Sequence, residues 1–182
     1  MLLSFISLSY ETGPPMPQLS LHSPLGVLTI TEDQGYIVSL DWGEAMGSRD
    51  RTPLLKKAAE QVQAYFDGDL KNFDLPLMPE GTEYRRKVWQ ALQDIPYGKT
   101  MTYGALAAKV GGSARSIGQA NHFNPIPIII PCHRVIGSNG ALGGYSGLDG
   151  VETKQYLLSL ENPDPDMVHP ASPSFQPSLP RS

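Results

Sequence analysis

The sequence predicts an α/β (α+β) protein with a small N-terminal domain and a mainly helical C-terminal domain. Apolar residues partly alternate over 19–30 and 35–42, as expected of strands in an antiparallel sheet. From residue 53 onward they recur mostly at helical spacing. A Pro-rich connection over 75–80 follows the first of these helical segments and closes the N-terminal unit, so we expect an α/β domain at 18–80 and a second domain at 81–161.

The N-terminal domain is expected to combine a β-hairpin with one helix. Asp33-Gln34-Gly35 separates the two strand-like segments and is typical of a turn. Over residues 53–66 the apolar positions follow helical spacing. Thr52 can cap this helix, Pro53 suits its first turn, and Gly68 follows its end.

The C-terminal domain is expected to contain a helix-turn-helix and an active-site loop. Thr102 can cap a short helix over 103–110, and Gly111-Gly112-Ser113 makes a turn in which Ser113 caps a second helix over 114–123. This arrangement fits a helix-turn-helix or an ordinary corner between two helices. The second helix favours close approach to a nucleic-acid groove, because it carries Arg115 among small and polar residues: Ala114, Ser116, Gly118, Gln119, Ala120 and Asn121.

The two ends of the chain look peripheral to these domains. Residues 1–17 are expected to form a flexible extension rather than a signal peptide, because no Lys or Arg precedes Arg49. The Pro- and Ser-rich residues 162–182 are expected to be a disordered tail. A last helix, capped by Asp149 with Glu152, is expected between the active-site loop and this tail. No apolar run approaches the ~18–20 residues that span a bilayer, so we expect a cytoplasmic protein without a membrane partner.

Charge is distributed unevenly along the chain, whose formal net charge is −4. Residues 1–80 hold five Lys/Arg against eleven Asp/Glu, whereas residues 81–135 hold seven against two. A basic middle segment fits a phosphate-binding face, although chance clustering on a solvated surface gives the same pattern.

Cys132 is the only cysteine, which excludes a disulfide framework and every zinc site built from several cysteines. A single cysteine often serves as a small buried apolar residue. Here it lies between the apolar run 128–130 and the pair His133-Arg134. Cationic and hydrogen-bonding neighbours lower the pKa of a thiol, so Cys132 is a candidate nucleophile and His133 its candidate base.

The string Pro131-Cys132-His133-Arg134-Val135, preceded by Asn124-Pro125 and followed by Gly144-Tyr145-Ser146-Gly147, resembles the O6-alkylguanine-DNA alkyltransferase family. The resemblance is close over 82–161 and looser over 18–80. It implies direct-reversal DNA repair without a cofactor, in which an alkyl group passes once and irreversibly from guanine O6 to the cysteine. It also implies a monomer that binds double-stranded DNA from the minor groove, flips the damaged base, and associates with the nucleoid when bound.

The resemblance assigns catalytic roles to five residues. Cys132 matches the acceptor, and His133 and Glu161 match a Glu–His–water–Cys relay that deprotonates it. Asn124 matches the hinge between the recognition helix and the active-site segment. Tyr103 matches the tyrosine that crowds the target phosphate and can give a proton to the departing guanine.

Further residues correspond to the substrate pocket and the DNA surface. Pro127, Tyr145 and Ser146 match walls of the alkyl pocket, and Arg115 matches the finger that fills the space left by the flipped nucleotide. The expected DNA-binding set is Tyr103, Ser113, Ala114, Arg115, Gln119, Ala120, Asn121 and Arg134.

The cysteine content of the chain sets it apart from two variants of the family pattern. No zinc is expected, because some members bind it through cysteines that this chain lacks. Cys132 also excludes the alkyltransferase-like proteins, which have tryptophan at the acceptor position.

Three other classes of protein fit these residues less well. A helix-turn-helix regulator would need longer side chains to read bases. A cysteine hydrolase usually has its histidine distant in sequence from the cysteine. A sensor that responds to alkylation would need a further regulatory domain.

Overall fold

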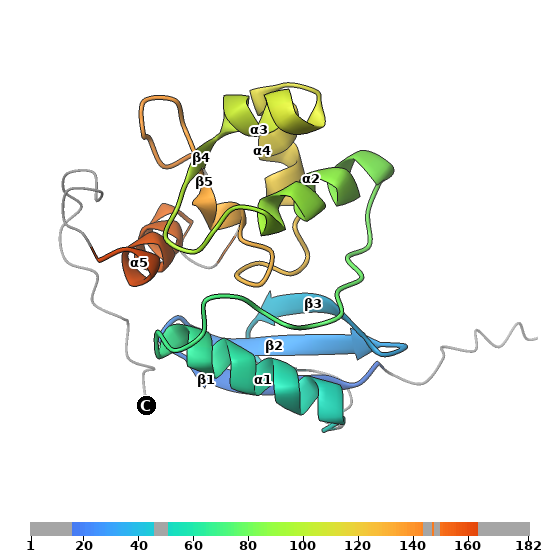
Figure 1. Cartoon of the computed structure of the whole chain (residues 1–182). Helices are drawn as coiled ribbons and strands as arrows, with labels where there is room; N and C mark the ends of the chain where they lie inside the picture. The colour runs from blue at the N-terminus through green and yellow to red at the C-terminus, as the bar shows by residue number, and fades with distance from the viewer. Residues whose placement is uncertain (1–15, 46–50, 144–146, 148–149, 164–182) are drawn as a thin grey trace, which may run out of the picture.

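The computed structural model describes residues 16–45, 51–143, 147 and 150–163. Figure 1 shows a sheet with one helix on its lower side and a group of helices above it. We call residues 16–80 the N-terminal half and residues 81–163 the C-terminal half. The mixed α/β class predicted from the sequence is confirmed.

The sheet has three antiparallel strands rather than the two of the predicted hairpin. They are β1 (Gln18–Ser23), β2 (Gly26–Asp33) and β3 (Tyr36–Trp42), in the order β1-β2-β3. The segment expected as one strand over 19–30 is broken by a turn, because Pro24 has no backbone donor for a ladder. Ser23 Oγ donates to the carbonyl of Gly26, whose φ of 96° suits glycine.

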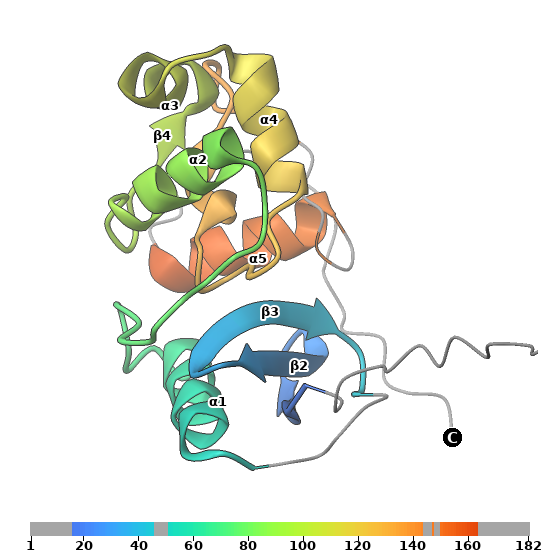
Figure 2. The same ribbon diagram turned by 90° about the vertical axis from the view of Figure 1, so that its right-hand side faces the viewer.

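The helix α1 (Pro53–Phe66) has the bounds that the sequence predicts. The Thr52 side chain accepts a hydrogen bond from the backbone N–H of Leu55 at 3.1 Å, and Gly68 follows with φ 82°. The helix packs against β1 and β2, as Figure 2 shows from the side. Its buried face consists of Leu55, Ala58, Val62, Tyr65 and Phe66.

In the C-terminal half, α2 (Glu83–Gln93) precedes a helix-turn-helix formed by α3 (Tyr103–Val110) and α4 (Ala114–His122). Thr102 caps α3, and Ser113 forms a capping box with Ser116 at the start of α4. The strand β4 (Met101–Thr102) pairs in parallel with β5 (Val135–Ile136). This pairing holds the start of α3 next to the segment that carries Cys132.

The chain continues through a 3-10 turn, η1 (Cys132–Arg134), and ends its described part with α5 (Val151–Glu161). The predicted capping box at the start of α5 is absent from the described structure. Gly150 occupies the N-cap without a side-chain hydrogen bond, and Asp149 lies outside the described residues. Most of the predicted extension 1–17 and tail 162–182 also lies outside them. No helix among the described residues is long and apolar enough to cross a membrane.

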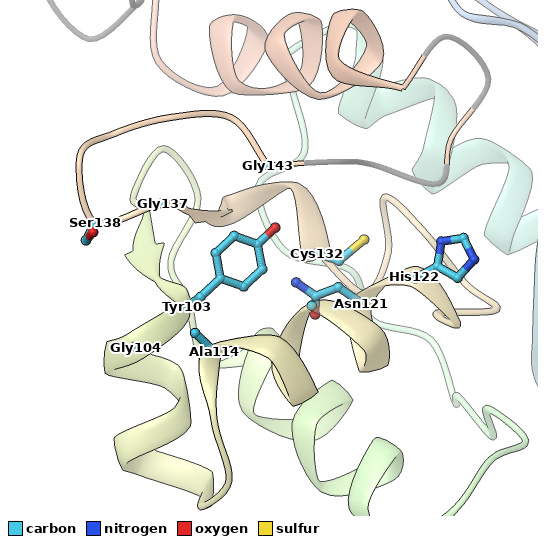
Figure 3. A pocket seen from close by; sticks show the side chains of 10 residues that line it. Tyr103, Gly104, Ala114, Asn121, His122, Cys132, Gly137, Ser138 and Gly143 are labelled. Atoms are coloured by element: carbon cyan, nitrogen blue, oxygen red, sulfur yellow. The ribbon is translucent and has the colours of Figure 1, made fainter.

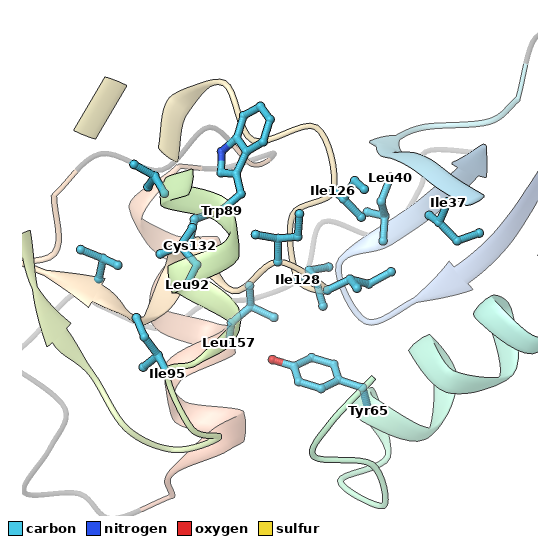
Figure 4. Packing of buried hydrophobic residues seen from close by; sticks show 14 of the residues in the cluster. Ile37, Leu40, Tyr65, Trp89, Leu92, Ile95, Ile126, Ile128, Cys132 and Leu157 are labelled. Carbon is cyan, nitrogen blue, oxygen red and sulfur yellow. The ribbon is translucent and has the colours of Figure 1, made fainter. Parts of the chain in front are cut away.

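One hydrophobic cluster joins the two halves, as Figure 4 shows. The segment 124–131 runs through it, with Ile126, Ile128 and Ile130 fully buried. The backbone N–H of Leu40 in β3 donates to the carbonyl of Pro125 at 2.9 Å. The sheet therefore supports the segment that leads directly to Cys132.

Candidate active site

A tight bend held by Asn124 places Cys132. The Asn124 Nδ2 donates to the carbonyl of Ile130 at 2.8 Å, and its Oδ1 accepts from the N–H of Ile126 at 3.1 Å. Between them Ile128 has φ 74°, a strained conformation for a β-branched residue. The bonds of Asn124 and the complete burial of Ile128 hold the strained bend in place.

Cys132 lies at the wall of a cavity of about 620 Å³ that opens beside the helix-turn-helix (Figure 3). Ala114, Gly118 and His122 line it from one face of α4, at the spacing expected of a helix. The remaining lining residues come from the start of α3, from later in α4, and from the active-site loop: Tyr103, Gly104, Asn121, Gly137, Ser138 and Gly143. Four glycines and one alanine among these lining residues leave room for a planar group to approach the sulfur.

The thiol itself is almost completely buried, with 2% of the residue exposed. Burial raises the pKa of Cys132, and the Asn124 amide, the positive charge of Lys154 and nearby backbone N–H groups only partly oppose this. The resting side chain is therefore a neutral thiol near pH 7. A base is needed to make it a nucleophile.

The candidate base, His133, follows Cys132 in the chain and lies next to a buried carboxylate. His133 Nε2 is 2.7 Å from Glu161 Oε1, and both side chains are fully buried. Burial opposes ionisation of Glu161, but the hydrogen bonds and charges of His133 and Arg134 outweigh it and lower the pKa to about 2. Because an ionised carboxylate only accepts, Nε2 carries the proton that it donates to Glu161.

This tautomer leaves His133 Nδ1 as a proton acceptor. Nδ1 is buried and has no hydrogen-bond partner in the described part of the chain. Burial lowers the pKa of His133, and the neighbouring Glu161 only partly restores it. A neutral imidazole with a free Nδ1 can accept a proton near pH 7.

Arg134 does not lie where the sequence placed it. It was expected on the DNA surface, yet the residue is 5% exposed. Its guanidinium donates from Nε to Glu161 Oε2 at 2.8 Å and from Nη2 to Oε1 at 2.9 Å. Its Nη1 donates to the carbonyl of Ile95 at 2.6 Å. Arg134 therefore neutralises the buried carboxylate, and its donors are directed away from solvent.

A buried lysine that the sequence reasoning missed stands beside Tyr103. Lys154 in α5 is 1% exposed and donates from Nζ to the carbonyl of Val135 at 2.6 Å and to the Tyr103 hydroxyl at 3.4 Å. Burial lowers the pKa of Lys154 to about 8, although the charge of Cys132 opposes this. Lys154 precedes Glu161 by seven residues, which is about two turns of a helix, so both side chains lie on one face of α5. This spacing is the sequence signal that could have identified Lys154.

The other expected site residues divide into accessible and buried groups. Ser113, Ala114, Arg115 and Gln119 are exposed on the helix-turn-helix. Ala120 is 1% exposed, and its carbonyl accepts from the Trp89 indole N–H, so the expected DNA contact does not fit its position. Pro127 is also buried and does not line the cavity of Figure 3. Tyr145 and Ser146 lie outside the described residues.

Asn121 faces the cavity rather than the outer surface of α4. It is 7% exposed, and Figure 3 shows its amide close to Tyr103 and Cys132. Neither its Nδ2 nor its Oδ1 makes a hydrogen bond of ordinary geometry to a described residue. Such a buried amide is available to a polar ligand. No three His, Cys, Asp or Glu side chains of the described residues gather where they could hold a metal ion.

This combination of fold and site matches one family over nearly the whole described chain. The chain belongs to the 6-O-methylguanine DNA methyltransferase family. The model for its DNA binding domain matches residues 83–163, and the model for its ribonuclease-like domain matches residues 19–79.

Individual relatives agree with this assignment. The chain is 45% identical over 151 residues to the constitutive methylated-DNA–protein-cysteine methyltransferase of Bacillus subtilis, covering 76% of this chain and 91% of that protein. It is 53% identical over 110 residues to the methylated-DNA–protein-cysteine methyltransferase of Methanosarcina acetivorans, covering 59% and 69%. The crystal structure of Mycobacterium tuberculosis OGT in complex with DNA superposes with a TM-score of 0.72 at 40% identity, covering 80% and 92%.

Proposed function

We propose that this protein repairs O6-alkylguanine in DNA by moving the alkyl group, typically methyl, to Cys132. The observation that carries the proposal is a buried thiol at the wall of a cavity beside a helix-turn-helix, together with a buried His133–Glu161 pair. Family membership and the names of the relatives support the same reaction.

The proposed step forms one bond and breaks one. The sulfur of Cys132 attacks the alkyl carbon, a C–S bond forms, and the bond between that carbon and guanine O6 breaks with its electron pair left on guanine. The thiol proton passes through a water molecule to His133 Nδ1, and Glu161 stabilises the imidazolium that forms. The thioether is not hydrolysed back to a thiol, so each molecule reacts once.

The leaving guanine needs a proton or a hydrogen bond at the moment of transfer. Tyr103 lines the cavity and is the candidate donor. Burial and the adjacent Cys132 raise the pKa of Tyr103, which keeps its hydroxyl protonated before the reaction. The amide of Asn121 supplies a further polar group at the same wall.

For the DNA surface we propose the exposed side of α3 and α4. The small side chains Ala114 and Gly118 permit close approach to a minor groove, and Arg115 follows Ala114 at the cavity edge. Flipping a base out of the duplex loses a few kcal/mol of stacking free energy, and an inserted arginine offsets part of that loss. We further propose that the protein acts as a monomer, in the cytoplasm and on the nucleoid.

Intact-protein mass spectrometry after incubation with a short duplex containing O6-methylguanine tests this function. We expect a stoichiometric gain of one methyl group, mapped to the peptide that contains Cys132. Cys132→Ala should gain no mass and still bind the duplex. An unmodified wild-type protein beside an intact lesion contradicts the proposal and leaves a DNA-binding protein without transfer activity.

A further inference from the structure

A hydroxyl from the N-terminal half reaches the buried carboxylate of the site. Tyr65, in α1, donates from its hydroxyl to Glu161 Oε1 at 2.8 Å, across 96 positions of the sequence. The tyrosine is 0% exposed. Figure 4 shows its hydroxyl pointing away from α1 and toward the helical half, near Leu157 of α5.

Glu161 accepts five hydrogen bonds from the described residues. Oε1 accepts from Tyr65, from His133 and from Arg134, while Oε2 accepts from Arg134 and from the N–H of Gly98. Four of these donors come from the C-terminal half. Tyr65 is the described donor from the N-terminal half, and it shares its oxygen with His133.

Packing alone does not account for a tyrosine at this position. The ring contacts the rings of Phe66, Phe73 and Tyr97, with centroids 5.4, 5.5 and 6.1 Å away. Phenylalanine would make the same ring contacts. A hydroxyl buried among such rings is costly unless it is hydrogen-bonded, and here it is bonded to the carboxylate that orients His133.

We propose that Tyr65 is a positioning residue for alkyl transfer, which holds Glu161 Oε1 in place and weakens its pull on the proton of His133. The inference rests on the proposed role of His133 and Glu161 in activating Cys132. It gives the N-terminal half a part in the reaction that acts through Glu161, although none of the described residues of that half lines the cavity in Figure 3.

The expected consequence concerns the basicity of His133. The groups that act on it are Glu161, which raises its pKa, and the charges of Arg134 and Lys154, which lower it together with burial. The other ionisable side chains nearby are Cys132, Tyr65, Tyr97 and Tyr103. Removing the Tyr65 hydroxyl makes Oε1 more basic, so the imidazole holds its proton to higher pH. Since transfer needs neutral His133, the acidic limb of the rate profile should move to higher pH.

Tyr65→Phe tests the proposal in the full chain, with Tyr97→Phe as a matched control. Tyr97 belongs to the same aromatic group, but its hydroxyl donates to the carbonyl of Leu160 and not to the carboxylate. The single-turnover rate on an O6-methylguanine duplex is measured from about pH 5 to about pH 8, which brackets the ordinary pKa of histidine. The melting temperature of each variant is measured in parallel.

For Tyr65→Phe we expect the acidic limb of the rate profile to shift to higher pH by about half a unit or more. At the acidic end of the profile, the single-turnover rate should fall roughly 3- to 10-fold. The profile of Tyr97→Phe should superimpose on that of the wild type. A Tyr65→Phe profile that also superimposes, whatever its melting temperature, overturns the inference. His133→Gln tests the proposed transfer of the Cys132 proton to His133 separately from the role of Tyr65. If His133→Gln leaves the transfer rate and its pH profile unchanged, that proton transfer is wrong, and the inference about Tyr65 is wrong as well.

Discussion

The helix-turn-helix and the buried charge cluster behind Cys132 are built in opposite ways. In the first, each cap bond spans three residues, from Thr102 to Ala105 and from Ser113 to Ser116. In the second, Glu161 is joined to His133, Arg134 and Tyr65 across 28, 27 and 96 positions. The helix-turn-helix is thus assembled locally and exposed, whereas the charge cluster is assembled from distant segments and buried.

The difference indicates how each region responds to change. An exposed helix face tolerates substitution, because water replaces a lost contact. In a buried ionic network, loss of one partner leaves the others charged without compensation. Substitutions in the charge cluster should therefore affect stability and chemistry together, while those in the helix-turn-helix should separate the two.

Glu161→Gln should give the largest effect. It leaves Arg134 buried without its carboxylate and His133 without its anionic partner, which should cost about 3–5 kcal/mol of unfolding free energy. The transfer rate should fall by about two orders of magnitude or more, because the imidazolium loses its stabilising charge. Chemical denaturation and single-turnover kinetics measure the two losses. Glu152→Gln, on the exposed first turn of the same helix, is the control and should change neither.

The same residue sets a pH dependence of stability. With a pKa of about 2 in the folded protein against about 4.3 unfolded, Glu161 contributes roughly 3 kcal/mol above pH 5 that is lost as pH falls toward 2. The lowered pKa of His133 acts in the same direction below about pH 6.5, because the unfolded chain binds that proton more readily. The acid unfolding curve of Glu161→Gln should be flatter. A curve parallel to that of the wild type contradicts the ionised cluster.

Much of the locally determined structure could be predicted from the sequence. The bounds of α1 and α3 follow from the caps Thr52 and Thr102, whose side chains act within three residues. The break between β1 and β2 was missed, although Pro24 and Gly26 mark it. Around the site, Cys132 and His133 could be named from their neighbours in the sequence, and Glu161 from a resemblance.

The partners of Glu161 could not be predicted in this way. Arg134 was expected among the DNA-binding residues, since nothing in the sequence links it to a carboxylate 27 positions away. Tyr65 belongs to an apolar helical stripe that predicts a core residue and nothing more. Their hydrogen bonds depend on how the two halves pack, and no periodicity or spacing in one segment carries that information.

Gly112→Ala should destabilise the turn between α3 and α4 without affecting the charge cluster around Glu161. Gly112 has φ 97°, and an added Cβ would lie 2.5 Å from the Tyr84 hydroxyl oxygen and 2.7 Å from Ser116 Oγ. We expect a loss of about 2 kcal/mol in unfolding free energy and weaker DNA binding. Gly111→Ala is the control, since its φ is 89° but no atom lies within 4 Å of the added Cβ. Equal losses of unfolding free energy in the two variants would show that the close contacts of Gly112 contribute nothing to stability.

Lys154→Met tests the place where the two regions meet, since Lys154 of α5 contacts Tyr103 at the start of α3. The ammonium is partly desolvated, so its removal should not lower the melting temperature, provided that methionine fills the space. Its charge lowers the pKa of Cys132, and its loss should slow transfer about tenfold. Gln155→Met, at the next position of the same helix, is the control. A full transfer rate in Lys154→Met would exclude an electrostatic role for this lysine.

Arg115→Ala should have the smallest effect, and one confined to the helix-turn-helix. The side chain is exposed at the start of α4, so unfolding free energy should stay within about 0.5 kcal/mol of the wild type. Repair of a duplex should slow roughly 3- to 5-fold, because the space left by the flipped nucleotide is no longer filled. Reaction with free O6-methylguanine base, which needs no flipping, should keep its rate. Equal slowing on both substrates would place Arg115 in the chemical step and remove the separation between recognition and reaction that the two regions otherwise display.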